Sequence, residues 1–577
     1  MTELSCLPHS VGYEDEGVCL SLQIGPYSIL LDCGLSDISV LRAEPADFVF
    51  CSHAHTDHMR GLLSLHRALP NLPIFTSAVT AKLMPLNWPA QEDAHFCRPL
   101  PWRTPVEIAP GLSVQLWPAG HLPGAACFLI TYKTAQRTYS VFYAGDCFLS
   151  NGRLVDGMPL AELRNLKPNV LIVEGSYGTE RHPNRKQQEN YLVERLGAAL
   201  ANRGRAVFPV PLLGLGQELL MLMRSHHNFT GQPIDIWVDP LIAAGCDAYL
   251  GLMPSLPETV QNFARHQPLF WDERVLPRVR RLGGLSDLKA ARSDADSVTH
   301  LGDDSSDAAI FLVHPATHPQ LYAQTCDQSN HDDWTIFVPD VANVSLWQGQ
   351  LDSWHPQEPW RFDWWMAMED ALTKGSLPED RLLDATPNAP KVEHYMLTNH
   401  CDGGGTTQLI HNLRPQHVIF VHGQSQQLMD LASLDDLQAR YQLHLPTPHQ
   451  MIELPLASAF WQPAPPRDTL YEGEVESSKA GIQLRLPTSL ESDPRWAQLA
   501  DTGIVEATWQ GNQLVIRGLN QQELMAVVPQ GRADGENTCY YCRHLRGQRC
   551  RNADSPLVGL QVTSDGSCAA FERSGKG

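Results

Sequence analysis

The sequence His53-Ala54-His55-Thr56-Asp57-His58 follows an apolar run, 48–51, that is typical of a buried strand. Side chains two residues apart on an extended segment point the same way, so the first two histidines can bind one metal ion. The chain then turns, and the aspartate and the last histidine can face a second ion. Histidine makes up 24 of the 577 residues, so this pattern arises by chance far less than once in such a chain. We therefore expect a metal site here rather than surface histidines that bind nothing.

Length, composition and charge limit the class of protein. The chain is 43% hydrophobic and 19% charged, which excludes a disordered or collagen-like protein and allows more than one core. Its net charge of −21 argues against broad coating of nucleic acid or anionic lipid, but not against a local basic groove. Residues 1–10 lack a signal-peptide pattern, and the most apolar segment, 206–223, is interrupted by Gln217 and Glu218. We expect a soluble, cytoplasmic protein with no membrane partner.

Two runs of alternating strand and helix patterns indicate an α/β fold with an insertion. The first run ends near residue 183 and contains strand patterns at 18–24, 27–31, 112–117, 127–132 and 139–143. A second run starts with an amphipathic helix pattern at 187–202 and continues with strands at 206–210 and 234–238. Strand–helix–strand patterns at 395–397, 406–413 and 418–421 then resemble the first run resumed. The expected division is 1–183 and 386–460 for one domain, 184–385 for an insertion, and 461–577 for a linker and C-terminal module.

Three further residues stand where apolar strands end. They are Asp32 in Leu-Leu-Asp-Cys-Gly, His121 in Ala-Gly-His-Leu-Pro-Gly and Asp146 in Tyr-Ala-Gly-Asp-Cys. With Asp32 before the histidine motif and the other two after it, they resemble the metallo-β-lactamase superfamily. That resemblance implies an αββα sandwich that binds two zinc ions. It also implies that Asp32 orients the ligand loop and that Asp146 is shared by both metals.

Later motifs resemble the β-CASP branch of that superfamily, which contains nucleases. They are Glu174-Gly175-Ser176-Tyr177-Gly178, Pro209-Val210 with Gln217-Glu218, Thr398-Asn399-His400-Cys401-Asp402 and Val421-His422-Gly423. The resemblance spans about residues 10 to 435 and implies an inserted α/β β-CASP domain. In this branch a histidine at the closing motif goes with RNA-processing members, so His422 points towards RNA. The sequence departs from the pattern of this branch at Gly175, at Leu215, at 314–318 and in the Trp-rich stretch 354–365. We expect the tryptophans of that stretch to be core residues or to stack on unpaired bases.

The resemblance also implies a ligand set and a mechanism. The first metal would be held by His53, His55 and His121, the second by Asp57, His58 and His422, and both by Asp146. The catalytic residues would be Asp57, Glu174 and His400, with His400 protonating the leaving oxygen and Glu174 orienting it. The run Gly403–Gly405 predicts a flexible turn that can admit a substrate.

The C-terminal module contains four closely spaced cysteines, Cys539, Cys542, Cys550 and Cys568. One Cys-x2-Cys pair in a short segment predicts a tetrahedral zinc or an iron–sulfur site, with unligated core cysteines as the alternative. Arginines 543, 546, 549 and 551 lie among them, and they could grip RNA phosphates or form a solvated face. The module lies beyond a Pro-rich linker at 462–467.

Together these features predict a two-zinc ribonuclease acting on RNA, most simply single-stranded RNA. The alternatives are a DNA nuclease, a small-molecule ester hydrolase of the same fold, and a non-catalytic RNA-binding scaffold. The ester hydrolase would need neither the insertion nor His400. The scaffold would not need an intact set of ligands.

Overall fold

A computed structural model describes most of the chain. The described residues are 4–12, 16–89, 91–164, 166–201, 204–282, 308–314, 334–339, 391–456, 474–478, 481–485, 505–510, 513–518, 542–546, 549–552, 555 and 572. The chain forms two compact units, Met1–Pro463 and Ala464–Gly577. The Trp-rich stretch, the linker at 462–467, Cys539 and Cys568 lie outside the described residues.

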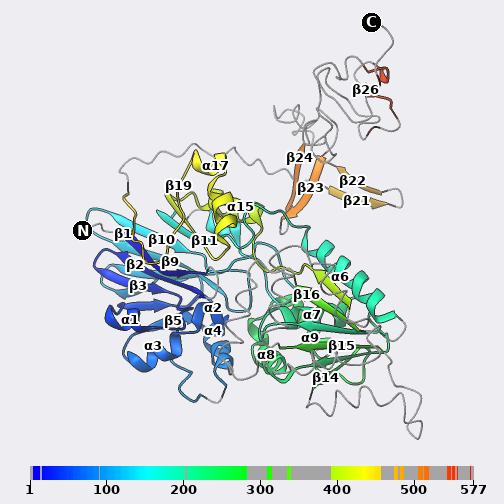
Figure 1. The fold of residues 1–577 in the computed structure, drawn as a ribbon, viewed down its shortest axis with the longest axis horizontal. Helices are drawn as coiled ribbons and strands as arrows, with labels where there is room; N and C mark the ends of the chain where they lie inside the picture. Colours follow the sequence, from blue (N-terminus) through cyan, green and yellow to red (C-terminus); the bar gives the residue numbers. More distant parts are fainter. Residues whose placement is uncertain are drawn as a thin grey trace, which may run out of the picture. The chain divides into compact units, whose positions relative to one another are not determined.

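Two seven-stranded sheets form the first part of the larger unit (Figure 1). The first sheet has the order β20 (Ile452–Glu453), β1 (Leu4–Val11), β2 (Val18–Ile24), β3 (Tyr27–Leu31), β4 (Phe48–Phe50), β5 (Ile74–Ser77) and β6 (Arg98–Leu100). The second has the order β19 (Gln442–His444), β18 (His417–Val421), β11 (Val170–Glu174), β10 (Thr138–Tyr143), β9 (Ala126–Lys133), β8 (Leu112–Pro118) and β7 (Val106–Ala109). Each sheet therefore combines strands that end by residue 174 with strands that begin after residue 416.

The two sheets share one apolar core because their strands alternate. Leu20 and Leu22 of β2 pack with Val141 and Tyr143 of β10 in one buried cluster, whereas Phe142 belongs to the cluster on the opposite face. Helices cover those outer faces, which gives the four layers visible in Figure 1. The helices beside the first sheet are α1 (Ser39–Ala43), α3 (Leu62–Ala68) and α4 (Ala78–Leu83). Those beside the second sheet are α5 (Leu160–Leu163), α15 (Gly403–Leu413), α16 (Ser425–Ala432) and α17 (Asp435–Gln438).

A third, six-stranded sheet forms the inserted part, drawn mainly in green in Figure 1. Its order is β14 (Arg278–Arg281), β13 (Ile234–Val238), β15 (Ala308–Val313), β12 (Arg205–Pro209), β16 (Trp334–Pro339) and β17 (Lys391–Tyr395), and every pairing is parallel. Its helices are α6 (Arg185–Leu200), α7 (Leu215–Ser225), α8 (Pro240–Gly251) and α9 (Glu258–His266). Nearly continuous apolar runs such as that of β15 fit strands buried on both faces.

The structure differs from the sequence prediction where the chain leaves the insertion. The strand expected at 395–397 is β17, which ends at Tyr395 and is the edge of the inserted sheet, beyond the expected boundary at residue 385. Gly403–Gly405 is also not a flexible turn, because α15 begins there. The Asp402 carboxylate accepts a hydrogen bond from the Gly405 amide at 2.8 Å, and a Cβ on Gly403 would lie 2.7 Å from the Gly178 carbonyl oxygen. This segment is therefore a capped and tightly packed helix start.

The C-terminal unit contains, among its described residues, three two-stranded antiparallel sheets. They pair β21 (Glu474–Ser478) with β22 (Gly481–Arg485), β23 (Val505–Gln510) with β24 (Gln513–Gly518), and β25 (Leu545–Arg546) with β26 (Arg549–Cys550). Over the whole described chain, no helix has both the length and the apolar character needed to cross a membrane.

Candidate metal centre

The histidine motif begins just after β4 and ends within the short helix α2 (Thr56–Met59). The backbone is extended at His55, with φ −81° and ψ 147°, and turns helical at Thr56. This change of direction sends Asp57 and His58 away from the first two histidines. His53, Asp57 and His58 are buried, and His55 is partly exposed. The geometry thus separates the motif into the two pairs that the sequence predicts.

The first group of potential ligands consists of His53, His55, His121 and Asp146. The Nδ1 atom of His55 lies 3.1 Å from His53 Nε2 and 3.0 Å from His121 Nε2. Asp146 Oδ2 lies 3.5 Å from His53 Nε2. Ligands about 2.0–2.1 Å from a tetrahedral zinc ion lie about 3.3 Å from one another, so these spacings fit a single ion.

The second group consists of Asp57, His58, Asp146 and His422. Asp57 Oδ2 lies 3.3 Å from His58 Nε2 and 3.1 Å from His422 Nε2. His58 Nε2 and Asp146 Oδ1 are both buried without a hydrogen-bond partner. Buried polar atoms are normally satisfied, and a cation between these atoms would satisfy both. The residues therefore fit a second metal ion beside the first, with Asp146 common to both groups.

Burial and charge set these side chains in the protonation states that metals require. Burial lowers the pKa of His53, His55 and His121, so their imidazoles are neutral near pH 7. Burial by itself would raise the pKa of Asp57 and Asp146. The neighbouring histidines outweigh it and hold both pKa values well below the usual range. The first group thus offers neutral nitrogens, and both groups offer a carboxylate anion.

His58 differs from the other ligand histidines. Burial lowers its pKa, but Asp146, Asp57 and Asp32 outweigh burial and raise the pKa well above the usual value. In the metal-free protein His58 therefore holds a proton among three carboxylates. A metal ion at the second site has to displace that proton, so binding there releases a proton and weakens at low pH.

Asp32 holds the ligand loop of the sandwich in place. Its Oδ2 atom accepts hydrogen bonds from His58 Nδ1 and Ser52 Oγ, both at 2.7 Å, and also from the Tyr143 hydroxyl. Its Oδ1 atom accepts from the Ser52 amide at 2.6 Å. These bonds fix which nitrogen of His58 faces the metal. On the other side of the site, Ser176 Oγ lies 2.9 Å from His422 Nδ1 and does the same for that ring.

The third group, Asp146, Glu174, His400 and His422, adds a different kind of residue. His400 Nδ1 donates to Glu174 Oε2 at 2.7 Å, and Glu174 Oε1 accepts from the Cys147 amide at 2.6 Å. The His400 ring stacks on the His422 ring, with centroids 5.6 Å apart and planes at 11°. Burial lowers the pKa of His400, but Glu174 outweighs burial and raises it to about 9. His400 is thus a cation at neutral pH, with 19% of its side chain exposed.

Comparison with known proteins gives the family. Residues 27–200 match the model of the β-lactamase superfamily domain. The chain is 43% identical to "Uncharacterized protein sll0514" of Synechocystis over 581 residues, which cover 99% of this chain and 97% of that protein. It is 28% identical to "Probable RNase MJ4" of Methanocaldococcus jannaschii over 36% of this chain and 54% of that protein. It is 22% identical to "Cleavage and polyadenylation specificity factor 73" of Drosophila melanogaster over 74% of this chain and 61% of that protein. The chain belongs to the β-CASP branch of the metallo-β-lactamase superfamily.

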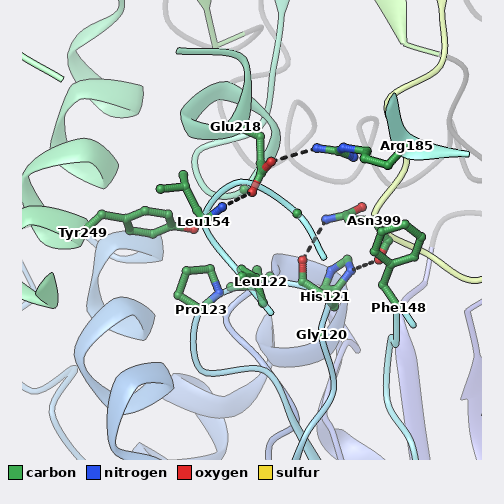
Figure 2. A pocket seen from close by; sticks show the side chains of 13 residues that line it. Gly120, His121, Leu122, Pro123, Phe148, Leu154, Arg185, Glu218, Tyr249 and Asn399 are labelled. Atoms are coloured by element: carbon green, nitrogen blue, oxygen red, sulfur yellow. Dashed lines mark hydrogen bonds and ion pairs between the residues drawn. The ribbon is translucent and has the colours of Figure 1, made fainter. Parts of the chain in front are cut away.

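The β-CASP insertion meets the sandwich beside His121 (Figure 2). A pocket there is lined by sandwich residues 120–123, by Phe148, Leu154 and Asn399, and by Arg185, Glu218 and Tyr249 of the insertion. The Glu218 carboxylate accepts from Arg185 Nη2 and from the amides of Arg153 and Leu154, each at 2.8 Å. The insertion is therefore tied to the sandwich by charge-assisted hydrogen bonds from the Arg153 and Leu154 amides to Glu218, at the edge of the site.

Sequence reasoning missed several residues that support this β-CASP site. Ser52 and Tyr143 donate hydrogen bonds to Asp32, which orients His58, and Asn399 donates to the His121 carbonyl. Ser52 directly precedes the histidine motif and Asn399 lies within the motif Thr398–Asp402, and those positions were the available signal. Tyr143 had no signal, since only the pairing of sheets brings β10 under Asp32.

The C-terminal cysteines are described only in part. Cys550 is buried on β26, Cys542 is partly exposed, and both thiols are free. Cys539 and Cys568 lie outside the described residues. Arg543 forms an ion pair with Glu572, which neutralises part of the basic cluster. The metal predicted for these cysteines stays a prediction.

Proposed function

We propose that this β-CASP protein is a zinc-dependent ribonuclease that hydrolyses single-stranded RNA. The chain is a metal-dependent hydrolase of the nuclease type by its family. The observation that supports the catalytic proposal best is the place of Asp146, which lies in all three ligand groups and beside the His400–Glu174 pair. Two ligand groups that share one carboxylate fit a pair of metals a few ångströms apart, the arrangement suited to phosphodiester hydrolysis.

Zinc is the proposed metal because both groups offer imidazole nitrogens and carboxylate oxygens. Two such ions would supply hydroxide near neutral pH and neutralise charge on the phosphate. His53, His55, His121 and Asp146 would hold one ion, and Asp57, His58, His422 and Asp146 the other. Asp57, which is also proposed to take part in catalysis, keeps a negative charge within the second group.

His400 is the proposed general acid. Its Nδ1 proton is directed to Glu174, so Nε2 is the atom left to face the substrate. A pKa of about 9 keeps His400 protonated at neutral pH, the state needed to give a proton to the departing oxygen. Glu174 orients the ring and sustains that charge. An ester hydrolase with a good leaving group would not need this pair.

RNA is proposed as the substrate because of the β-CASP insertion and because the named relatives are RNA-processing proteins. His422, at the closing motif, agrees with that choice. The C-terminal module is proposed to carry a further zinc or iron–sulfur site on Cys539, Cys542, Cys550 and Cys568 and to contact RNA. We propose that the protein acts on RNA in the cytoplasm.

The test uses end-labelled RNA and DNA of equal sequence, each single- and double-stranded, with the zinc-loaded protein. We expect cleavage of single-stranded RNA that is lost in Asp146→Ala and retained in Asp93→Ala, a surface aspartate paired with Arg67. Cleavage of DNA alone would replace RNA by DNA as the substrate. Binding of RNA without cleavage by the fully metallated protein would favour the scaffold alternative.

A further inference from the structure

The two metal groups differ in the origin of the atoms that orient their histidines. In the second group, His58 is oriented by Asp32 and His422 by Ser176, and both partners belong to the sandwich. In the first group, only His53 has a sandwich partner, the Ser52 hydroxyl at 3.0 Å. The other two histidines of the first group contact main-chain carbonyls supplied by the insertion or by the segment that leaves it.

His121 is oriented by Asn399, four residues after the last strand of the inserted sheet. The Asn399 carbonyl accepts from His121 Nδ1 at 3.0 Å, which leaves His121 Nε2 unprotonated and facing the first site. The Asn399 side chain also donates from Nδ2 to the His121 carbonyl at 3.2 Å (Figure 2). One residue thus fixes both the ring and the backbone of a ligand.

His55 is oriented by the insertion itself. Its Nε2 atom lies 3.4 Å from the carbonyl oxygen of Leu213, in the loop between β12 and α7. This leaves Nδ1 to face the first site, where it lies near His53 and His121. Gly214 follows with φ +92°, a conformation that favours glycine and that aims the Leu213 carbonyl at the histidine.

Arg185, the first residue of α6, holds the Asn399 segment against the insertion. Its Nη1 atom donates to the Thr398 carbonyl at 2.6 Å, while Nη2 donates to Glu218 at 2.8 Å. Gln188, one turn along α6, accepts from the Thr398 amide at 3.2 Å. Helix α6 of the insertion therefore forms hydrogen bonds with both the carbonyl and the amide of Thr398, the residue before Asn399.

We propose that the inserted domain controls the affinity of the first metal site but not of the second, and that Arg185 is the positioning residue of this coupling. When α6 holds Thr398, the Asn399 carbonyl that follows it fixes the tautomer of His121, while the Leu213 carbonyl of the insertion fixes that of His55. When the grip on Thr398 is lost, the His121 ring is freed to rotate and the first ion binds more weakly. Loss of a residue that orients ligands lowers metal affinity about 10- to 100-fold in zinc sites. The inference rests on the metal site of the proposed function, but not on its substrate.

The experiment measures zinc affinity by competition with a chelator, in the absence of nucleic acid. His422→Ala retains only the first group intact, and His121→Ala retains only the second. Arg185→Met is then added to each background. We expect it to weaken zinc binding about 10- to 100-fold in the His422→Ala background and to leave the His121→Ala background unchanged. Arg67→Met, which removes an exposed ion pair with Asp93, should change neither.

Equal weakening in both backgrounds, or none in either, would overturn the proposal. Asn399→Ala is a milder second variant, because it removes only the 3.2 Å bond to the His121 carbonyl. If Arg185→Met does not fold, Asn399→Ala takes its place in the test. It should weaken zinc binding by a smaller factor, and again only in the His422→Ala background. Zinc affinity is read without substrate, so a protein that binds zinc as expected but cuts no RNA would refute the ribonuclease and not this coupling.

Discussion

His400 donates from Nδ1 to Glu174 Oε2 at 2.7 Å, although the two residues are 226 positions apart in the chain. Glu174 ends β11 of the second sheet, whereas His400 follows the inserted domain. The bond can form only when the chain has returned from the insertion to the sandwich. The proposed general acid is therefore assembled from two segments by the fold, beside the metal ligands.

His400→Ala should leave both metals bound, since seven other residues complete the two groups. RNA cleavage should fall by about 10² to 10⁴, the usual contribution of a general acid, measured as single-turnover rate. An activated phosphodiester with a good leaving group should lose much less. His266→Ala, an exposed histidine on α9, is the control and should behave as wild type. RNA cleavage at the wild-type rate by His400→Ala would refute its role.

The pH at which the cleavage rate falls should depend on the hydrogen bond between His400 and Glu174. A general acid acts in its protonated form, so the rate should fall as pH rises through the pKa of His400. Glu174→Gln removes the carboxylate that raises this pKa, and the fall should move to lower pH. Glu162→Gln, which alters an exposed pair with Arg103, should leave the profile unchanged. An unshifted profile in Glu174→Gln would mean that another group limits the rate.

Asp146→Ala should lose most of both metals because Asp146 belongs to both ligand groups. Metal content after dialysis, measured by elemental mass spectrometry, tests this. Asp93→Ala, on the surface, should keep the full content. Full occupancy in Asp146→Ala would contradict the shared carboxylate.

Asp32→Asn should weaken the second metal by about 10- to 100-fold, since the bond that orients His58 is altered. It should also lower the free energy of unfolding by about 1–3 kcal/mol, because four buried donor atoms lose a charged acceptor. Chelator competition and urea denaturation measure the two effects. Asp37→Asn, which alters an exposed aspartate that accepts from Ser39, is the control. An unchanged zinc affinity would show that Asp32 does not position His58.

Truncation after Asp534 should remove any metal beyond the pair in the main site. The four cysteines of the tail belong to no motif of the main site, so hydrolysis of a small phosphodiester should persist. A brown colour in the anaerobic full-length protein would indicate iron–sulfur, and bound zinc without colour would indicate a zinc clamp. Unchanged total metal after truncation would show that the thiols are ordinary core cysteines.

The sequence by itself determined the local features of this protein. Strands β2, β3 and β13 have the bounds that the alternation of apolar residues predicts, because that pattern depends on neighbouring positions only. The separation of His53 and His55 from Asp57 and His58 follows in the same way from a strand that turns into a helix. His121, Asp146 and His422 could be linked to that motif only by resemblance, since no local pattern relates residues so far apart in the chain.

Only the tertiary structure decided which groups orient the ligands. Tyr143 reaches Asp32 because two sheets pack face to face, and Asn399 reaches His121 because α6 grips Thr398. The glycines at 403–405, which favour a turn when read alone, begin a helix because Asp402 caps it and Gly178 packs against it. Such outcomes depend on contacts between distant segments, whose hydrogen bonds and packing outweigh local conformational preference.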